Sequence, residues 1–110
     1  MKILAKNKKH LQDLIKKEIY KYGNKCNLNH LDTSLITDMS YLFKESPFNG
    51  DISRWDTSQV ETMMGMFHGS LFNNNISQWN TSSLTDISYM FNYSKFNTNI
   101  SQWNTSNVKI

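Results

Sequence analysis

Apolar residues recur along most of the chain at a fixed spacing of 24 positions. The segments 31–34, 55–58, 79–82 and 103–106 all end in Thr-Ser, and the spacing between them never changes. When the chain is aligned in rows of 24, eight columns are wholly or almost wholly apolar. Because one short unit cannot bury its own apolar face, we expect successive units to stack and share a continuous core.

All six Phe and all three Trp lie in these columns. Together with an Ile column they supply the largest side chains of every complete unit, and we expect them to form the structural core. The predicted core residues are Trp55, Trp79, Trp103, Phe43, Phe67, Phe91, Phe48, Phe72, Phe96, Ile52, Ile76 and Ile100.

Within one unit, the pattern predicts an extended piece followed by a short helix. Val60, Met63, Met66 and Phe67 have the spacing of one helical face, and residues 58 and 61 form a Ser-x-x-Glu capping box before it. Residues 52–57 mix Ile and Trp with Ser and Thr, which favours a strand of about three or four residues. Each unit is therefore expected to contain a short strand, a turn, a helix of about two turns and a return loop.

The return loops carry Asn at positions 49, 73 and 97. Asn side chains satisfy turn backbone groups, and stacked Asn residues bond along a repeat, so we expect an Asn ladder on this edge.

The N-terminal segment differs from the repeat. One helical face is formed by Leu11, Leu14, Ile15, Ile19 and Tyr22, and a Gly-Asn pair at 23–24 is a typical helix end. We predict an N-terminal capping helix within residues 1–26 and repeats over residues 27–110, with units at about 31–54, 55–78 and 79–102 and a partial unit at 103–110. The C-terminal edge around Trp103 is then expected to be uncapped, unless a partner covers it or the natural protein continues.

The unit W-[DN]-T-S-x-[VL]-x-x-[MI]-x-x-M-F-x-x-S-x-F-N-x-[DN]-I-S occurs at residues 55–77 and again at 79–101. It resembles the BspA-like leucine-rich-repeat family of bacterial surface proteins, over about residues 27–110. The resemblance implies a right-handed solenoid that has strands on one face and binds proteins. The predicted fold class is therefore an α/β repeat, a short right-handed leucine-rich-repeat-like solenoid of about three coils with an N-terminal amphipathic capping helix.

Composition narrows the functional classes. A chain of 110 residues with 38% hydrophobic and 19% charged residues fits one domain and excludes a multi-domain enzyme. The single Cys26 excludes an internal disulfide framework, so packing must hold the fold. No signal peptide is visible at the N-terminus, which predicts a cytoplasmic location, or a surface or secreted one if the natural chain is longer.

The net charge of +3 conceals an asymmetry. Residues 1–25 hold eight Lys against two acidic residues, whereas residues 26–110 hold four basic residues against seven acidic ones. The basic character therefore belongs to the predicted cap helix, and most of the chain repels phosphate.

Catalytic and metal patterns are weak. The three His residues fall in different repeat columns, Cys26 and His30 alone do not make a zinc site, and the many Ser and Thr residues fit caps and ladders better than nucleophiles. We therefore expect no enzyme activity, no metal and no cofactor.

Columns that vary from unit to unit are free to encode specificity, and the predicted function is a non-catalytic protein–protein interaction module that binds through the strand face. The candidate residues are His30, Asp32, Arg54, Asp56, Gln78, Asn80, Gln102 and Asn104.

The alternative is a small intracellular inhibitor or adaptor whose cap helix binds an acidic protein or a nucleic-acid complex. Its basic patch is Lys8, Lys9, Lys16, Lys17 and Lys21. A homodimer through the uncapped C-terminal edge is a third hypothesis, and no membrane association is expected.

Overall fold

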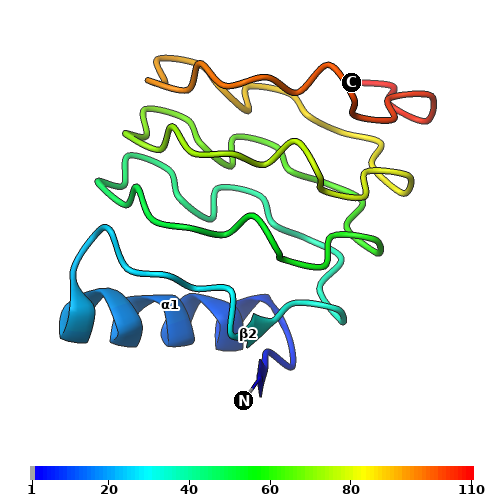
Figure 1. Cartoon of the computed structure of the whole chain (residues 1–110). Helices are drawn as coiled ribbons and strands as arrows, with labels where there is room; N and C mark the ends of the chain where they lie inside the picture. The colour runs from blue at the N-terminus through cyan, green and yellow to red at the C-terminus, as the bar shows by residue number, and fades with distance from the viewer. Residues whose placement is uncertain (1) are drawn as a thin grey trace.

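The computed structural model describes residues 2–110 and contains one helix and two very short strands. Strand β1 (Ile3–Leu4) pairs in parallel with β2 (Leu31–Asp32), with Ile3 opposite Leu31, and helix α1 (Lys8–Tyr22) lies between them in sequence. Figure 1 shows the rest of the chain as irregular loops arranged one above another over α1, with the C-terminus at the end away from the helix. No helix in the described part of the chain is long and apolar enough to cross a membrane.

The predicted fold class, a leucine-rich-repeat-like solenoid with a strand and a helix in every coil, is wrong. Residues 33–110 contain no helix and no strand, only the isolated bridges Asp38↔Thr62 and Thr62↔Asp86. The molecule is a compact body of 37 × 28 × 21 Å with a radius of gyration of 12.8 Å. That radius is close to the value of about 13 Å expected for an ordinary domain of this length.

Consecutive tight turns replace the predicted helix of each unit. In the first unit the N–H groups of Leu42, Lys44 and Ser46 each donate to the carbonyl oxygen three residues earlier, at 3.1–3.3 Å. Tyr41 and Glu45 have positive φ angles of 57° and 55°. A positive φ at the third residue is the mark of a type II turn and is incompatible with an α-helix. The same turns recur at residues 63–70 and 87–94.

The remaining N–H groups of these turns join one unit to the next. Met39, Tyr41, Phe43 and Glu45 donate to carbonyl oxygens 23 residues ahead, at 2.7–3.0 Å, and the series starting at Met63 repeats the pattern. We call residues 27–50, 51–74, 75–98 and 99–110 the first, second, third and fourth layers. Equivalent residues of neighbouring layers therefore lie side by side, although the backbone is neither helical nor regular strand.

Two columns of Phe rings run through the layers. Phe43, Phe67 and Phe91 stack with centroids 5.7 and 5.9 Å apart and nearly parallel planes. Phe48, Phe72 and Phe96 form the second column, with both spacings at 6.2 Å. Such offset stacking adds about 0.5–1.5 kcal/mol per pair beyond area burial.

Nine of the twelve predicted core residues are buried. Phe91, Phe96 and Ile100 are only partly buried, because they lie in the last layers of residues 2–110. The Trp column is also hydrogen-bonded: the indole N–H groups of Trp55, Trp79 and Trp103 donate to the carbonyl oxygens of Leu28, Ile52 and Ile76 at 2.9, 3.0 and 3.0 Å.

The Asn ladder on the return loops is confirmed. The Asn49 side-chain oxygen accepts the backbone N–H of Asn73 at 2.8 Å, and the Asn73 oxygen accepts that of Asn97 at 2.7 Å.

Helix α1 covers the first layer. Asn7 caps its N-terminus by accepting the N–H of His10 at 2.9 Å, and Gly23, with φ of 91°, ends it by donating to Ile19 at 2.7 Å. Leu11 and Ile15 are buried beneath the helix. This end of the Phe and Trp columns is therefore closed, whereas the opposite end has no such cover within residues 2–110.

Candidate functional site

The predicted recognition residues form two adjacent columns that behave differently. Arg54, Gln78 and Gln102 are exposed at equivalent positions of successive layers, and no side-chain hydrogen bond or salt bridge joins them to any of residues 2–110. We call these three residues the open column. The backbone beside it is held by hydrogen bonds. The N–H of Arg54 donates to the side-chain oxygen of Asn29 at 2.8 Å, and the N–H of the Trp that follows each member donates to the Ile two residues before that member, at 3.0–3.3 Å.

The neighbouring column consists of carboxylate and amide side chains that are already engaged in turns. Each accepts the backbone N–H of the Ser two residues later, at 2.9–3.0 Å. Its members are Asp32, Asp56, Asn80 and Asn104. These residues hold the local backbone and leave little capacity for a partner. The backbone N–H and the hydroxyl of Ser34 hold the pKa of Asp32 below its usual value.

His30, predicted as the first recognition residue, belongs to the helix contact instead. Its Nε2 lies 2.8 Å from Oε1 of Glu18 on α1, and Glu18 is largely buried in this contact. His30 therefore joins the cap to the first layer and is separated in role from Arg54, Gln78 and Gln102.

The predicted basic patch on α1 is partly neutralised within the molecule. The ammonium of Lys8 bonds the Ser40 hydroxyl at 2.7 Å and lies 3.4 Å from Asp38, and Lys9 pairs with Asp13 at 3.0 Å. Burial alone would raise the pKa of Asp38, but hydrogen bonds from Ser40 and the charge of Lys8 outweigh it, and the pKa is lowered.

The other three lysines of the patch differ in surroundings. Lys21 lies 5.3 Å from the ring centre of Tyr22, Lys16 lines a cavity, and Lys17 is exposed. The structure thus brings the five lysines to one helix but gives each its own environment. A contiguous anion-binding face is not formed by Lys8 and Lys9, because both already contact acidic or hydroxyl partners.

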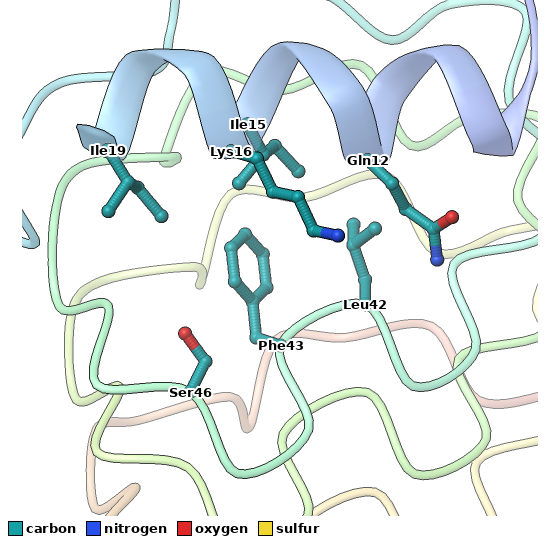
Figure 2. A pocket seen from close by; sticks show the side chains of 7 residues that line it. All are labelled: Gln12, Ile15, Lys16, Ile19, Leu42, Phe43 and Ser46. Atoms are coloured by element: carbon teal, nitrogen blue, oxygen red, sulfur yellow. The ribbon is translucent and has the colours of Figure 1, made fainter. Parts of the chain in front are cut away.

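A cavity of about 290 Å³ lies between α1 and the first layer. Figure 2 shows the Lys16 side chain extending along it toward Leu42 and Gln12, while Phe43 stands in its middle and Ser46 at its other end. Its lining residues are Gln12, Ile15, Lys16, Ile19, Leu42, Phe43 and Ser46. The volume is at the lower limit of small-molecule pockets, and sequence reasoning did not indicate it.

Among residues 2–110, the metal-ligating side chains are dispersed, and the only thiol is that of Cys26. No group of three or more His, Cys, Asp or Glu side chains within residues 2–110 is placed to hold a metal ion. Burial raises the pKa of the Cys26 thiol, and the Glu18 carboxylate raises it further. A thiol with a raised pKa is mostly protonated at neutral pH and makes a poor nucleophile.

Sequence reasoning also missed a group of exposed tyrosines on the tight turns. Tyr41, Tyr89 and Tyr93 all have φ angles of 57–58°, and Tyr93 is 88% exposed. His68 meets the Tyr93 ring edge-on with centroids 5.7 Å apart. The sequence signal was the column that alternates Tyr41, Gly65 and Tyr89, because Gly in a column marks a positive φ.

Comparison with known proteins gives a family. Residues 10–110 match the model of a family described as "Mycoplasma protein of unknown function, DUF285". No curated protein and no solved structure matches the chain.

Proposed function

We propose that this chain, which belongs to the DUF285 family of Mycoplasma proteins of unknown function, is a non-catalytic protein-binding module. Its recognition surface is the open column Arg54, Gln78 and Gln102. The observation that carries this proposal is that three uncommitted polar side chains stand at equivalent positions of consecutive layers, each beside a Trp whose backbone and indole N–H groups are both hydrogen-bonded.

Rigidity is what makes such a column useful for binding. Each of its residues is followed directly by a buried Trp whose indole N–H is bonded to the preceding layer. The backbone therefore needs little ordering when a partner arrives, and the entropic cost of association is reduced. Neighbouring layers of this kind lie about 4.8 Å apart, so the three heads span about 10 Å.

The chemistry of the column indicates the partner surface. The Arg54 guanidinium suits a carboxylate in bidentate geometry, and the two Gln amides both donate and accept hydrogen bonds. We therefore propose a protein partner that presents an acidic side chain beside exposed amide or hydroxyl groups. The repeat's sequence resemblance to BspA-like bacterial surface proteins supports a binding role.

The ion pairs within the molecule favour the open column over α1 as the binding surface. Lys8 and Lys9 of the basic patch are already engaged with Ser40, Asp38 and Asp13, which weakens the adaptor alternative.

The test compares two triple variants of the full chain as immobilised baits in lysate of the source cell, with nuclease present. The first variant carries Arg54→Ala, Gln78→Ala and Gln102→Ala. The matched control carries Lys17→Ala, Lys21→Ala and Tyr20→Ala on the exposed side of α1. We expect one set of proteins to be retained by wild type and control but lost from the open-column variant.

A purified protein from that set should then bind the open-column variant at least about tenfold more weakly than wild type, equivalent to about 1.4 kcal/mol. Thermal melts verify that both variants are folded. Retention by the open-column variant together with loss from the α1 variant would contradict the proposal and move the function to the lysine-rich helix.

A further inference from the structure

The C-terminal edge of the layers carries a row of unused backbone donors. Phe43 and Phe67 donate their N–H groups to the next layer at 2.9 and 3.0 Å, but the equivalent N–H of Phe91 has no acceptor within residues 2–110. The N–H groups of Tyr89 and Tyr93, two residues to either side, are equally without acceptors among these residues. The first N–H group of this row does have an acceptor, because Ile87 donates to the carbonyl oxygen of Ile110 at 2.7 Å.

The series of indole hydrogen bonds and the Asn ladder also end at this edge. The carbonyl oxygens of Leu28, Ile52 and Ile76 each accept an indole N–H from the Trp 27 residues ahead, and Ile100 is the next carbonyl in that series. Within residues 2–110 the oxygen of Ile100 accepts only the N–H of Trp103, at 3.0 Å. Asn97 likewise ends the Asn ladder, with its side-chain oxygen unbonded to any of residues 2–110.

Apolar surface accompanies these polar groups. Phe67 and Phe72 are fully buried because they have rings above and below, whereas Phe91 and Phe96 have a ring on one side only and are partly buried. A segment that covered the edge would bury the outer faces of both rings.

We propose that this edge of residues 2–110 binds a polypeptide segment that carries the chain's own repeat pattern, F-x4-F-x6-W. The geometry of the existing layers defines this occupant. Carbonyl groups at every second residue would meet the N–H groups of Tyr89, Phe91 and Tyr93. The two Phe rings of the segment would stack on Phe91 and Phe96, and its indole would reach the Ile100 oxygen.

A second copy of the chain fits the edge less well. Two identical edges that face each other both present N–H donors, which do not bond to one another. The opposite end of a second copy is covered by α1, whose Leu11 and Ile15 are buried there. The edge therefore selects a free repeat segment over a dimer, which argues against the homodimer predicted from the sequence.

The test uses a labelled synthetic peptide with the sequence of residues 63–83 and the full chain. The peptide contains the pattern as Phe67, Phe72 and Trp79. We expect saturable binding by fluorescence anisotropy, weakened about tenfold when the peptide carries Trp79→Phe, since one buried hydrogen bond is lost. A scrambled peptide is expected not to bind.

Two protein variants locate the site. Phe96→Asp at the edge is expected to abolish peptide binding, and Tyr20→Asp on α1, where the side chain is 94% exposed, is expected to leave it unchanged. A measurement without mutation is amide hydrogen exchange of the wild-type chain, where the peptide should slow exchange at Tyr89, Phe91 and Tyr93 but not in α1.

Absence of binding, equal binding of the scrambled peptide, or no protection at these three amides would overturn the proposal. If sedimentation equilibrium showed that the chain alone forms a dimer, and if Phe96→Asp abolished this dimer, the occupant of the edge would be a second copy and not a free segment. The open column lies on a different set of residues, so either proposal can fail without the other.

Discussion

At the scale of single residues, the Trp column shows why an indole is used where any large apolar side chain would fill the space. Trp55, Trp79 and Trp103 each donate to a carbonyl oxygen of the preceding layer. The first layer has no preceding layer of this kind, and there the column holds Leu31, which pairs with β1 instead. The residue type therefore follows the availability of an acceptor.

Trp79→Phe isolates this hydrogen bond from the packing. The Phe ring keeps most of the buried apolar contact but leaves the Ile52 oxygen without its indole donor, so we expect a loss of about 1–3 kcal/mol in the free energy of unfolding. Trp79→Ala should cost about 3–5 kcal/mol because a cavity is added. Urea denaturation measures both, and Trp103→Phe, at the less buried end of the column, is the control expected to lose less. Equal stability of wild type and Trp79→Phe would show that the bond contributes nothing net.

The Asp and Asn residues two positions before Ser serve the backbone. Asp51 accepts the backbone N–H and hydroxyl of Ser53 at 2.9 and 2.7 Å, and Asn75 accepts the same groups of Ser77 at the same distances. The N–H of Ser53 and then its hydroxyl hold the pKa of Asp51 below the ordinary value of 3.8. A lowered pKa means that the ionised form stabilises the fold.

Asn75 shows that an Asn side chain accepts the same two hydrogen bonds. Asp51→Asn is therefore expected to leave the melting temperature at pH 7 nearly unchanged and to reduce the fall of the melting temperature at low pH. The contribution of the Asp51 carboxylate is fully present above the unfolded pKa and is lost as the pH falls through the folded pKa, so wild type should lose more stability than the variant between pH 5 and about pH 2. Thermal melts across that interval measure the difference. Parallel curves for the two proteins would assign no stabilising role to the charge.

At the scale of elements, the sequence predicted which residues are buried more accurately than it predicted the backbone conformation. Leu11, Ile15 and Gly23 gave the position of α1 because a 3.6-residue period and a Gly end belong to a helix. The spacing of Val60, Met63 and Met66 also fits a helix, but consecutive tight turns bury the same residues. Gly65 and Gly69, which occupy the positive-φ positions, were the signal that distinguishes the two structures.

The sequence indicated one part of the candidate surface, the open column, but not the hydrogen bonds and the ion pair that engage the other predicted residues. The open column follows from variability alone, since the side chains of Arg54 and Gln78 make no hydrogen bond to a neighbouring layer. Variability does not indicate that the side chains of Asp56 and Asn80 are engaged in turns. The signal for these turns is that each residue stands two positions before a Ser, a spacing that favours a side-chain-to-backbone turn. The contact between Glu18 and His30 joins segments of unlike sequence, and no repeat pattern indicates it.

Gly50 tests how closely the end of the first layer approaches the segment that precedes this layer. A Cβ at this position would lie 1.9 Å from the backbone oxygen of Cys26, which no side-chain movement relieves. Gly50→Ala is therefore expected to destabilise the fold by about 3 kcal/mol or more, at the upper end for overpacking. Gly69→Ala, whose nearest contact is the flexible Glu45 side chain at 3.2 Å, should cost only about 1–2 kcal/mol for its positive φ. Chemical denaturation compares the two variants, and equal losses would show that the backbone at Gly50 can move away from Cys26.

At the scale of the whole molecule, the two ends of the stack are unequal. Helix α1 buries Leu11 and Ile15 against the first layer, and residues 1–25 carry most of the excess positive charge. The opposite end exposes part of Phe91 and Phe96 and a row of N–H groups that have no acceptor among residues 2–110. Local stability is expected to decrease from the helix end toward the C-terminal edge, because each layer is held by the layers on both sides.

Amide hydrogen exchange of the free chain measures this gradient at three equivalent positions. The N–H groups of Phe43 and Phe67 are bonded to the following layer, and that of Phe91 meets no acceptor among residues 2–110. We expect exchange at Phe91 to be at least about a hundredfold faster than at Phe67, because an unbonded edge amide exchanges without opening of the fold. Phe43, beneath α1, should be as slow as Phe67. If Phe91 were protected like Phe67 in dilute solution, the edge would already be covered, and sedimentation of the same sample would show whether a second copy covers it.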